Sequence, residues 1–396
     1  MRVVVVTYRL PVYLGDAPSN TVFNLVKHLS RNHIVSLVGL AHRSVPNDSL
    51  QQLRQYCHRL EWMYWPKWRG VVGATRGLVS SEPLQMWYYR SKAFADLVKR
   101  VIAEEQIELA YGYHLRSGQF LADVNSIPRV IAIHPAQVLH FGRRHELTHN
   151  PILRTVYGIE WGRLIGYEAV LAQKFDTCHL ISERDRDAID PDRRLRNVFI
   201  NPHGTDVKSF AFPAGTVREK DTVVFSGNMS MDTNSNAALY FYRNILPIIW
   251  TKQPRARFLI VGRNPPRSLL KLREDRRVIV TGTVPDVRPY LWKASVGVDP
   301  VRMAAGMQNK LIEGMAAGLP MVITPEANEG ILAPEGRAVL IGRGPEEFAA
   351  HVLSLLHDPV QARSVATEGL AFVQAQWSWE HLFGCLEKKM NLLASS

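Results

Sequence analysis

Short apolar runs alternate with longer helical patterns along the whole chain, and this alternation constrains the fold more than any other feature. The first run, residues 3–6, is four consecutive valines. It is too short for a helix, and the breakers Pro11 and Gly15 follow it, as is typical of a buried strand. A helical pattern and a second apolar run, residues 34–40, come next. Strand, helix and strand in this order predict a parallel sheet with right-handed crossovers.

The same alternation runs through both halves of the chain, so we predict an α/β protein of two Rossmann-like domains. A chain of 396 residues with 46% hydrophobic content can bury two cores. We place an N-terminal domain at 1–205, a C-terminal domain at 206–375 and a C-terminal helix at 376–396, which we expect to pack on the N-terminal domain. The other predicted strands are 109–113, 129–133, 177–182, 197–201, 222–226, 258–261, 278–280, 296–298 and 321–324, and the main predicted helices are 91–105, 237–250, 307–317 and 372–393.

Composition argues against several classes of protein. The three cysteines, Cys57, Cys178 and Cys385, contain no CxxC pair and fit neither a disulfide framework nor a zinc site. No apolar run reaches the roughly 18 residues of a membrane span, and the first run is too short for a signal peptide, so we expect a cytoplasmic protein. The net charge of +12 attracts anions, but no nucleic-acid-binding module is recognisable. The turn after the first strand also lacks the GxGxxG of nicotinamide enzymes.

The densest chemical signal lies in residues 296–324, where a strand, a turn of small residues ending at Gly306, a helix and another strand follow one another. A helix N-terminus at the carboxyl end of a parallel strand presents free N–H groups and partial positive charge, which suit a diphosphate. Lys310 and Glu313 lie three residues apart, on one face of this helix. The lysine can reach a phosphate oxygen, and the carboxylate can accept hydrogen bonds from vicinal hydroxyls. The alternative is an ordinary crossover helix with a surface ion pair.

Residues 306–322, GMQNKLIEGMAAGLPMV, resemble the donor-binding signature of GT-B glycosyltransferases of family four, a large group that uses nucleotide sugars. Other stretches resemble the family in order and spacing: NPHGTD at 201–206, FSGNM at 225–229, FLIVG at 258–262, TGTVPD at 281–286 and WSWE at 377–380. The resemblance implies the GT-B fold, in which two Rossmann-like domains face each other across a cleft. It also implies retaining transfer of a hexose from a UDP- or GDP-sugar to an acceptor hydroxyl in bacterial polysaccharide or glycoconjugate synthesis, without a cofactor or metal.

Carried over to this chain, the resemblance assigns Lys310 to the donor diphosphate and Glu313 to the ribose hydroxyls. The first glutamate of the family's paired motif would fall at Ala305, so recognition of the transferred sugar is expected to rest on backbone amides. The family's Arg and Lys pair after the first C-domain strand is not evident either, and we expect Arg263 or Arg302 to supply its charge. The other positions expected at the donor are Gly15, Gly227, Asn228, Gly282, Val284, Gly306, Met307, Gln308 and Asn309.

In the N-terminal domain, His134 follows a predicted strand and matches a position where many family members carry a histidine. We expect it to bond a sugar hydroxyl or the acceptor, and the alternative is a solvent-facing loop histidine. His114 is a weaker candidate by the same logic. Glu160 and Glu168, eight residues apart on a helical pattern, are expected to be structural, because paired-glutamate glycosidase chemistry needs another scaffold.

Residues 62–72 mix tryptophan and tyrosine with basic side chains. Three interpretations stay open: an interfacial membrane contact, an acceptor-binding platform, or a core segment with snorkelling cations. The expected partners are therefore a nucleotide sugar, a glycan, lipid-linked or small-molecule acceptor, and a peripheral contact with an anionic membrane at the inner face. Two other functions remain open, a GT-B sugar-nucleotide epimerase and an inactive GT-B scaffold, which the change at Ala305 would permit.

Overall fold

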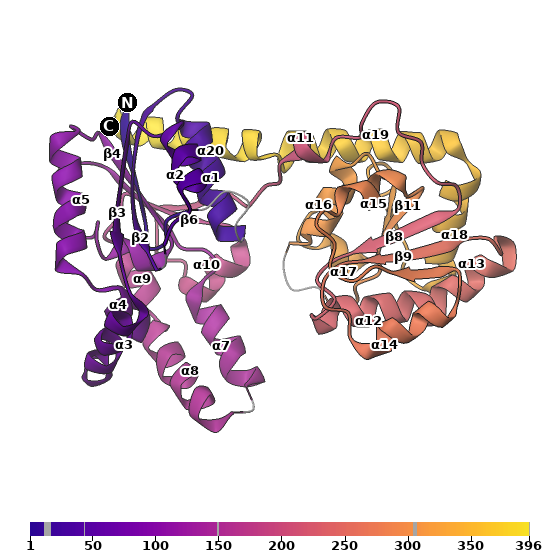
Figure 1. The fold of residues 1–396 in the computed structure, drawn as a ribbon, viewed down its shortest axis with the longest axis horizontal. Helices are drawn as coiled ribbons and strands as arrows, with labels where there is room; N and C mark the ends of the chain where they lie inside the picture. Colours follow the sequence, from indigo (N-terminus) through magenta and orange to yellow (C-terminus); the bar gives the residue numbers. More distant parts are fainter. Residues whose placement is uncertain (12–16, 43, 149, 304–306, 396) are drawn as a thin grey trace. The chain divides into compact units, whose positions relative to one another are not determined.

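The computed structural model describes residues 1–11, 17–42, 44–148, 150–303 and 307–395, which form two compact units (Figure 1). Unit 1 is Met1–His203 with Leu382–Ser396, and unit 2 is Gly204–His381. The first division falls two residues before the predicted domain boundary, and the chain returns to unit 1 at Leu382 rather than at residue 376. No helix of the described residues is long and apolar enough to cross a membrane.

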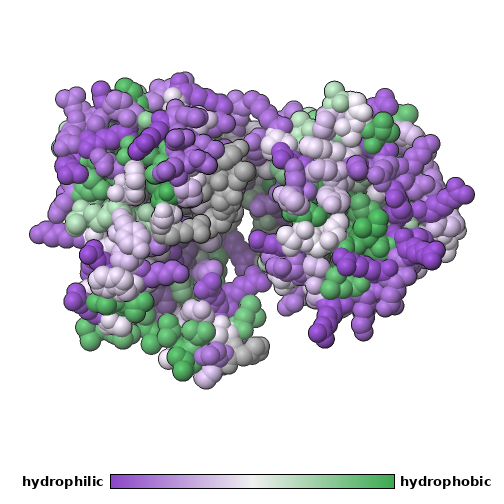
Figure 2. Space-filling view, in the orientation of Figure 1, coloured by the Kyte–Doolittle hydropathy of each residue, from purple (hydrophilic) through white to green (hydrophobic). Residues whose placement is uncertain are grey.

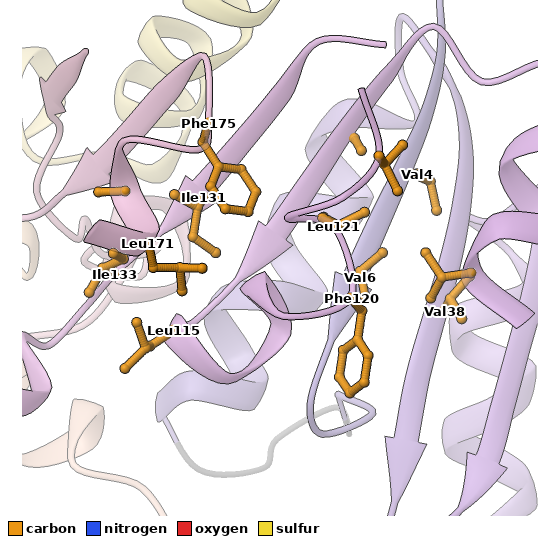
Figure 3. Close-up of a cluster of buried hydrophobic side chains, with 14 of the residues drawn as sticks. Val4, Val6, Val38, Leu115, Phe120, Leu121, Ile131, Ile133, Leu171 and Phe175 are labelled. Atoms are coloured by element: carbon orange, nitrogen blue, oxygen red, sulfur yellow. The ribbon is translucent and has the colours of Figure 1, made fainter. Parts of the chain in front are cut away.

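Unit 1 is built on a seven-stranded sheet in the order β3-β2-β1-β4-β5-β6-β7, with every neighbouring pair parallel. The strands are β1 (Arg2–Thr7), β2 (Ile34–Ala41), β3 (Arg59–Tyr64), β4 (Leu109–Tyr113), β5 (Arg129–Ala132), β6 (Thr177–Leu180) and β7 (Val198–Ile200). Val4 and Val6 of β1 are fully buried, and Figure 3 shows them near Phe120 and Leu121 in the core of this unit. The valine run is therefore an inner strand of the sheet, between β2 and β4, where both faces are covered.

The edge strand β3 is not among the predicted strands. Its sequence, RLEWMY, places charged residues at positions 59 and 61 among apolar and aromatic ones, and none of its residues is fully buried, so it lacks the continuous buried apolar run of the inner strands. Of the aromatic residues in the 62–72 segment, only Trp65 is buried, and its indole donates to the Tyr88 carbonyl oxygen at 3.1 Å. The core interpretation of this segment thus holds for Trp65 and is wrong for the exposed Trp68, Val71 and Val72.

Helices connect the strands of unit 1, and the C-terminal helix packs on the same unit. The helices are α1 (Ala17–Leu29), α2 (Asn47–Arg54), α3 (Lys67–Arg76), η1 (Gly77–Val79), α4 (Leu84–Tyr89), α5 (Lys92–Glu104), α6 (Leu115–Gly118), α7 (Gln137–Leu147), α8 (Pro151–Leu164), α9 (Tyr167–Ala172), α10 (Glu183–Ile189) and α20 (Trp379–Ala394). The Glu387 carboxylate of α20 lies 2.9 Å from the Nε2 atoms of His28 and His33. Asn201 Nδ2 donates to the Leu382 carbonyl oxygen at 2.9 Å, so α20 is held at both its start and its middle.

Unit 2 is built on a six-stranded parallel sheet in the order β10-β9-β8-β11-β12-β13. The strands are β8 (Thr222–Ser226), β9 (Arg257–Val261), β10 (Val278–Val280), β11 (Val296–Asp299), β12 (Met321–Ile323) and β13 (Leu340–Ile341). The helices are α11 (Val207–Phe210), α12 (Asp232–Tyr240), η2 (Phe241–Ile245), α13 (Leu246–Lys252), α14 (Arg267–Leu270), η3 (Lys271–Glu274), α15 (Arg288–Lys293), α16 (Asn309–Ala316), α17 (Pro325–Asn328), α18 (Pro345–His357) and α19 (Pro359–Gln376). Two apolar clusters, one on each face of the sheet, form the core.

Three predicted helices differ from the structure. The helix predicted at 237–250 starts at Asp232 and contains the π-helical η2, which ends next to Pro247, because this proline has no N–H for the α-helical ladder. The helix predicted at 372–393 is two helices, since the Trp377 carbonyl and the Trp379 amide both bond to the backbone of Thr205. The donor helix α16 begins at Asn309 rather than at residue 307.

Candidate functional site

The strand order of unit 2 places a topological switch point between β8 and β11. The chain proceeds from β8 outward through β9 and β10, and then returns to the other side of β8 to continue through β11, β12 and β13. Ligands of open α/β sheets bind outside the carboxyl ends of the strands at such a point. The residues that follow β8 and β11, from Gly227 and from Asp299 onward, are therefore where a ligand of this unit belongs.

Lys310, in the first turn of α16, is the centre of a polar cluster at this point. Its Nζ donates to Asn234 Oδ1 at 2.9 Å and to Gln308 Oε1 at 2.8 Å, and it lies 3.5 Å from Asp299 Oδ1. The Lys310 side chain is 11% exposed, so the interpretation as a surface ion pair with Glu313 is wrong. The ammonium is instead held at the switch point by these three side chains, where its charge can attract an anion.

Asp299 ends β11 and is completely buried. Among the described residues neither of its carboxylate oxygens has a hydrogen-bond partner, and Lys310 is the cation beside it. Burial raises the pKa of Asp299 to about 6, and the charge of Lys310 opposes this rise. Sequence reasoning missed this residue, although a carboxylate at the end of the apolar run VGVD was a visible signal.

Glu313 lies one turn after Lys310 on α16. Burial raises the pKa of its carboxyl group to about 7, and the Lys310 charge lowers it in part. No hydrogen bond from the described residues reaches this carboxylate, in contrast to the glutamates of unit 1. A partly buried carboxylate with unused acceptor capacity is suited to a ligand that brings its own hydroxyl donors.

The N-terminus of α16 has no side-chain cap from the described residues. Gln308 occupies the cap position without a side-chain hydrogen bond to the helix amides, because its Oε1 accepts from Lys310. The uncapped first turn therefore keeps its partial positive charge. Met307 packs against the apolar cluster on this side of the sheet, and Asn309 starts the helix. Gly306 and Ala305, which the sequence placed at the same turn, lie outside the described residues.

Two glycines shape the backbone beside this cluster. Gly262, after β9, has φ 151°, and a Cβ there would collide with the carbonyl oxygen of Gly227, after β8. The Gly227 amide in turn donates to the Val261 carbonyl at 3.0 Å. Asn234 joins this loop to the lysine, since its Nδ2 donates to the Asn228 carbonyl at 3.0 Å while its Oδ1 accepts from Lys310. Asn234 was also missed by sequence reasoning.

The remaining predicted donor residues of unit 2 are placed as follows. Arg263 follows β9 with an exposed side chain, and Arg302 follows β11 with its guanidinium 4.0 Å from the ring centre of Tyr240. Gly282 has φ 78° with open space around its Cβ position, and Val284 packs against the same apolar cluster as Met307. The structure records no contact between either arginine and Lys310. Gly15, in unit 1, lies outside the described residues.

His134 in unit 1 is 3% exposed, so its interpretation as a solvent-facing histidine is wrong. Its ring packs against the rings of Tyr113, His179 and His203. The ring centroids of His134 and His203 are 4.5 Å apart. Neither ring nitrogen has a hydrogen-bond partner among the described residues, and burial holds the pKa of His134 well below its usual value. His114 is also buried, and its Nδ1 accepts from the Arg116 amide at the start of α6.

Glu160 and Glu168 are structural, as expected from the sequence. Glu160 accepts from the amides of Leu84 and Gln85 at the start of α4. Glu168 accepts from the amides of Gln137 and Val138 at the start of α7, at 2.8 and 2.9 Å. Each carboxylate thus caps a helix from a distant segment. The described residues contain no group of three or more His, Cys, Asp or Glu arranged for a metal ion.

Comparison with known proteins places this cluster in a recognised family segment. Residues 220–358 match the family model described as Glycosyl transferases group 1. A GDP-mannose-dependent monoacylated alpha-(1-6)-phosphatidylinositol monomannoside mannosyltransferase of Corynebacterium glutamicum is 25% identical over 162 residues, which are 38% of this chain and 42% of that protein. The chain therefore aligns with less than half the length of this curated relative.

Several solved structures share the fold over the length of this chain. Sucrose-phosphate synthase from Thermosynechococcus elongatus superposes with a TM-score of 0.62 at 15% identity, covering all of both chains. Anabaena HepE in complex with UDP has a TM-score of 0.64 at 12% identity, covering 99% of this chain and 100% of that one. TarM has a TM-score of 0.65 at 11% identity, covering 100% of this chain and 99% of that one. The fold is the GT-B fold, and the resemblance to glycosyltransferases that the sequence indicated is confirmed.

Proposed function

We propose that this protein is a retaining glycosyltransferase that moves a sugar from a nucleotide diphosphate sugar to an acceptor hydroxyl. The observation that carries the proposal is the cluster of Lys310, Asn234 and Asp299 beside Glu313 at the switch point of unit 2. This cluster lies entirely within the segment that matches the group 1 model. A cation, an uncapped helix start and a carboxylate one turn further along are the groups that a nucleoside diphosphate needs.

Each group has a separate role in this proposal. The Lys310 ammonium and the first turn of α16 hold the diphosphate and stabilise the negative charge that grows on it as the sugar leaves. The Glu313 carboxylate accepts hydrogen bonds from the ribose hydroxyls. Asp299 and Asn234 keep the lysine in position, and Asp299 is a positioning residue because it is buried behind the ammonium.

The reaction balances without a covalent enzyme intermediate. The bond between the anomeric carbon and the diphosphate oxygen breaks, and the acceptor oxygen forms a bond to the same carbon on the same face. The acceptor proton passes to an oxygen of the departing diphosphate. Arg263 and Arg302 are the candidates for additional positive charge, and His134 is the candidate group of unit 1 for a sugar hydroxyl.

The relatives guide the choice of substrates to test. The curated relative is named for GDP-mannose, and HepE has been solved with UDP and with UDP-glucose. We therefore infer a UDP- or GDP-hexose as donor and a bacterial glycoconjugate or polysaccharide precursor as acceptor.

The decisive experiment incubates the protein with UDP-glucose, GDP-mannose and a panel of acceptors and analyses the products by mass spectrometry. A new glycosidic bond with release of UDP or GDP supports the proposal, and retained anomeric configuration in the product, read by NMR, supports the stereochemistry. Isomerised donor without transfer indicates the epimerase alternative. Absence of binding to any nucleotide sugar in calorimetry indicates an inactive scaffold.

A further inference from the structure

Arg218 is a charged residue of unit 2 to which the proposed mechanism assigns no role. It lies in the segment that leads into β8 and is partly buried, whereas hydrophilic residues cover much of the visible surface of this unit (Figure 2). Burial lowers the pKa of Arg218 to about 10, and no charge of the described residues opposes this shift. The guanidinium therefore stays protonated at neutral pH, and hydrogen bonds to neutral acceptors have to compensate for its burial.

Main-chain carbonyls at the ends of two helices accept hydrogen bonds from this guanidinium. Nη1 donates to Leu291, Trp292 and Ala294 at the end of α15, at 2.9 to 3.2 Å. Nη2 donates to Ala317 and Gly318 at the end of α16, at 3.1 and 2.6 Å. The last carbonyls of a helix have no partner within the helix, and their partial negative charge favours a cation. One side chain thus binds the ends of both helices.

The end of α16 is already formed by the backbone alone. Gly318 has φ 61°, and the amides of Gly318 and Leu319 donate to carbonyls of the last turn at 2.9 and 3.0 Å, as in a Schellman motif. This motif ends the helix and leaves the carbonyls of Ala317 and Gly318 to Arg218. The guanidinium is therefore not needed to terminate α16, and what it adds is the connection between α16 and α15.

The two connected segments carry residues of the candidate site at their other ends. Ala294 leads directly into β11, which ends at Asp299, and Lys310 lies in the first turn of α16. The chain from Ser295 to Asp299 is roughly 13 Å long and the helix from Lys310 to Ala317 roughly 10 Å, from the rise per residue of a strand and of an α-helix. Both run from the edge of the sheet at the guanidinium to the edge where Lys310 Nζ and Asp299 Oδ1 are 3.5 Å apart.

Between these two ends α16 packs closely on β11. A Cβ at Gly297 of β11 or at Gly314 of α16 would collide with the Met321 sulfur, so the Met321 side chain limits how closely the helix and the strand approach. Glu219, next to the arginine, adds a hydrogen bond at the same edge of the sheet, since its carbonyl accepts from Ser295 Oγ at 2.7 Å. The methionine thus keeps α16 and β11 apart, and the guanidinium keeps them from separating further.

We propose that Arg218 is a positioning residue of the donor site: by connecting the ends of α15 and α16, it sets the distance between Asp299 and Lys310. Its effect on donor binding rests on the proposed glycosyl transfer, whereas its effect on this distance does not. The planar guanidinium presents two NH₂ groups side by side, one for each set of carbonyls. A lysine ammonium is a single point of charge and can serve only one set well.

The first experiment needs no ligand and compares urea unfolding of Arg218→Met, Arg218→Lys and the control Ile249→Ala at pH 5 and pH 8. Ile249 is completely buried in the apolar cluster on the other face of the sheet, so the control loses stability through a cavity away from α16. A wider gap between Asp299 and Lys310 raises the pKa of Asp299, so the urea midpoint of Arg218→Met should fall further at pH 8 than at pH 5. Arg218→Lys should show a smaller difference of the same sign, and the control should show none. An equal fall at both pH values in both Arg218 variants would mean that Arg218 only stabilises the fold, and would overturn the proposal.

The second experiment titrates UDP and GDP into the same proteins by calorimetry, at a temperature at which all of them are folded. Affinity for the nucleotide that the native protein binds should fall about tenfold or more in Arg218→Met and less in Arg218→Lys, because Lys310 and the start of α16 move relative to β11. The control should keep native affinity, since lower stability alone does not change a folded site. Native affinity in both Arg218 variants would overturn the positioning role.

The two experiments distinguish the possible failures. If the native protein binds no nucleotide, the proposed function fails, and the unfolding experiment still decides whether Arg218 sets the distance between Asp299 and Lys310. If the native protein and the Arg218 variants bind a nucleotide equally well, the positioning role alone is overturned and the proposed function stands.

Discussion

Replacing Lys310 with methionine should destabilise the protein in a pH-dependent manner, because Lys310 is the cation beside the fully buried Asp299. The folded-state pKa of Asp299 is about 6 against 3.8 for an ordinary aspartate, so the unfolded chain loses its proton first and ionisation of Asp299 costs stability between these two values. Above pH 6 this cost is constant in the native protein. Without Lys310 the pKa of Asp299 rises further, so in the variant the loss of stability continues to grow as the pH increases above 6.

The size of the effect follows from the pKa. Each pH unit above the native pKa at which Asp299 stays protonated costs about 1.4 kcal/mol, so at pH 8 the variant should lose up to about 3 kcal/mol relative to the native protein. At pH 5 Asp299 is largely protonated in both proteins, and this loss should nearly vanish. A loss of about 1 kcal/mol from the hydrogen bonds to Asn234 and Gln308 should remain at both pH values.

Urea unfolding of Lys310→Met at pH 5 and pH 8 measures this difference. The double variant Asp299→Asn with Lys310→Met removes the buried charge and should recover most of the stability at pH 8. Its affinity for UDP and GDP should nevertheless stay lower than that of the native protein. An equal loss of stability at both pH values would refute the assignment of Asp299 as the lysine's buried counter-ion. Native nucleotide affinity in the double variant would refute the role of Lys310 at the diphosphate.

Three further predictions concern other residues. The pKa of Glu313 is about 7, and only the ionised carboxylate accepts two hydrogen bonds. Calorimetry should therefore show a nucleotide affinity that weakens about tenfold per pH unit below 7, and Glu313→Gln should abolish this dependence. A nucleotide affinity of the native protein that does not change with pH would contradict this prediction. Of Arg263→Ala and Arg302→Ala, at least one should weaken donor binding, and unchanged affinity in both would show that neither supplies the charge. Glu168→Ala should lower the free energy of unfolding by about 1–3 kcal/mol, since two amides of α7 lose their acceptor, without changing donor affinity; unaltered stability would dispute its role as a cap.

Patterns local in sequence predicted most of the fold and pointed to two residues of the candidate site. The valine run of β1 and the alternation after it predicted two parallel sheets, because strands buried on both faces are continuous apolar runs. Lys310 and Glu313 could be proposed from the sequence because they share one face of a single helix. The edge strand β3 was missed, since an edge strand with one exposed face needs no apolar run.

Groups that only folding brings together were beyond sequence reasoning. Asn234 lies 76 residues before Lys310, and nothing in its surroundings on α12 marks it as the acceptor of that lysine. Asp299 was visible only as a carboxylate at the end of a strand. The burial of His134 against His203 likewise depends on the packing of two distant loops.

The central claim is that unit 2 holds a nucleotide sugar at Lys310 and Glu313, and calorimetric titration tests it most directly. UDP, GDP, UDP-glucose and GDP-mannose should be titrated at pH 8 into the native protein and into Glu313→Gln. We predict that one nucleotide and the corresponding nucleotide sugar bind the native protein. Glu313→Gln should weaken that binding by about tenfold or more through loss of the ribose contact. Absence of binding by all four ligands, or equal affinity in the two proteins, would contradict the donor site.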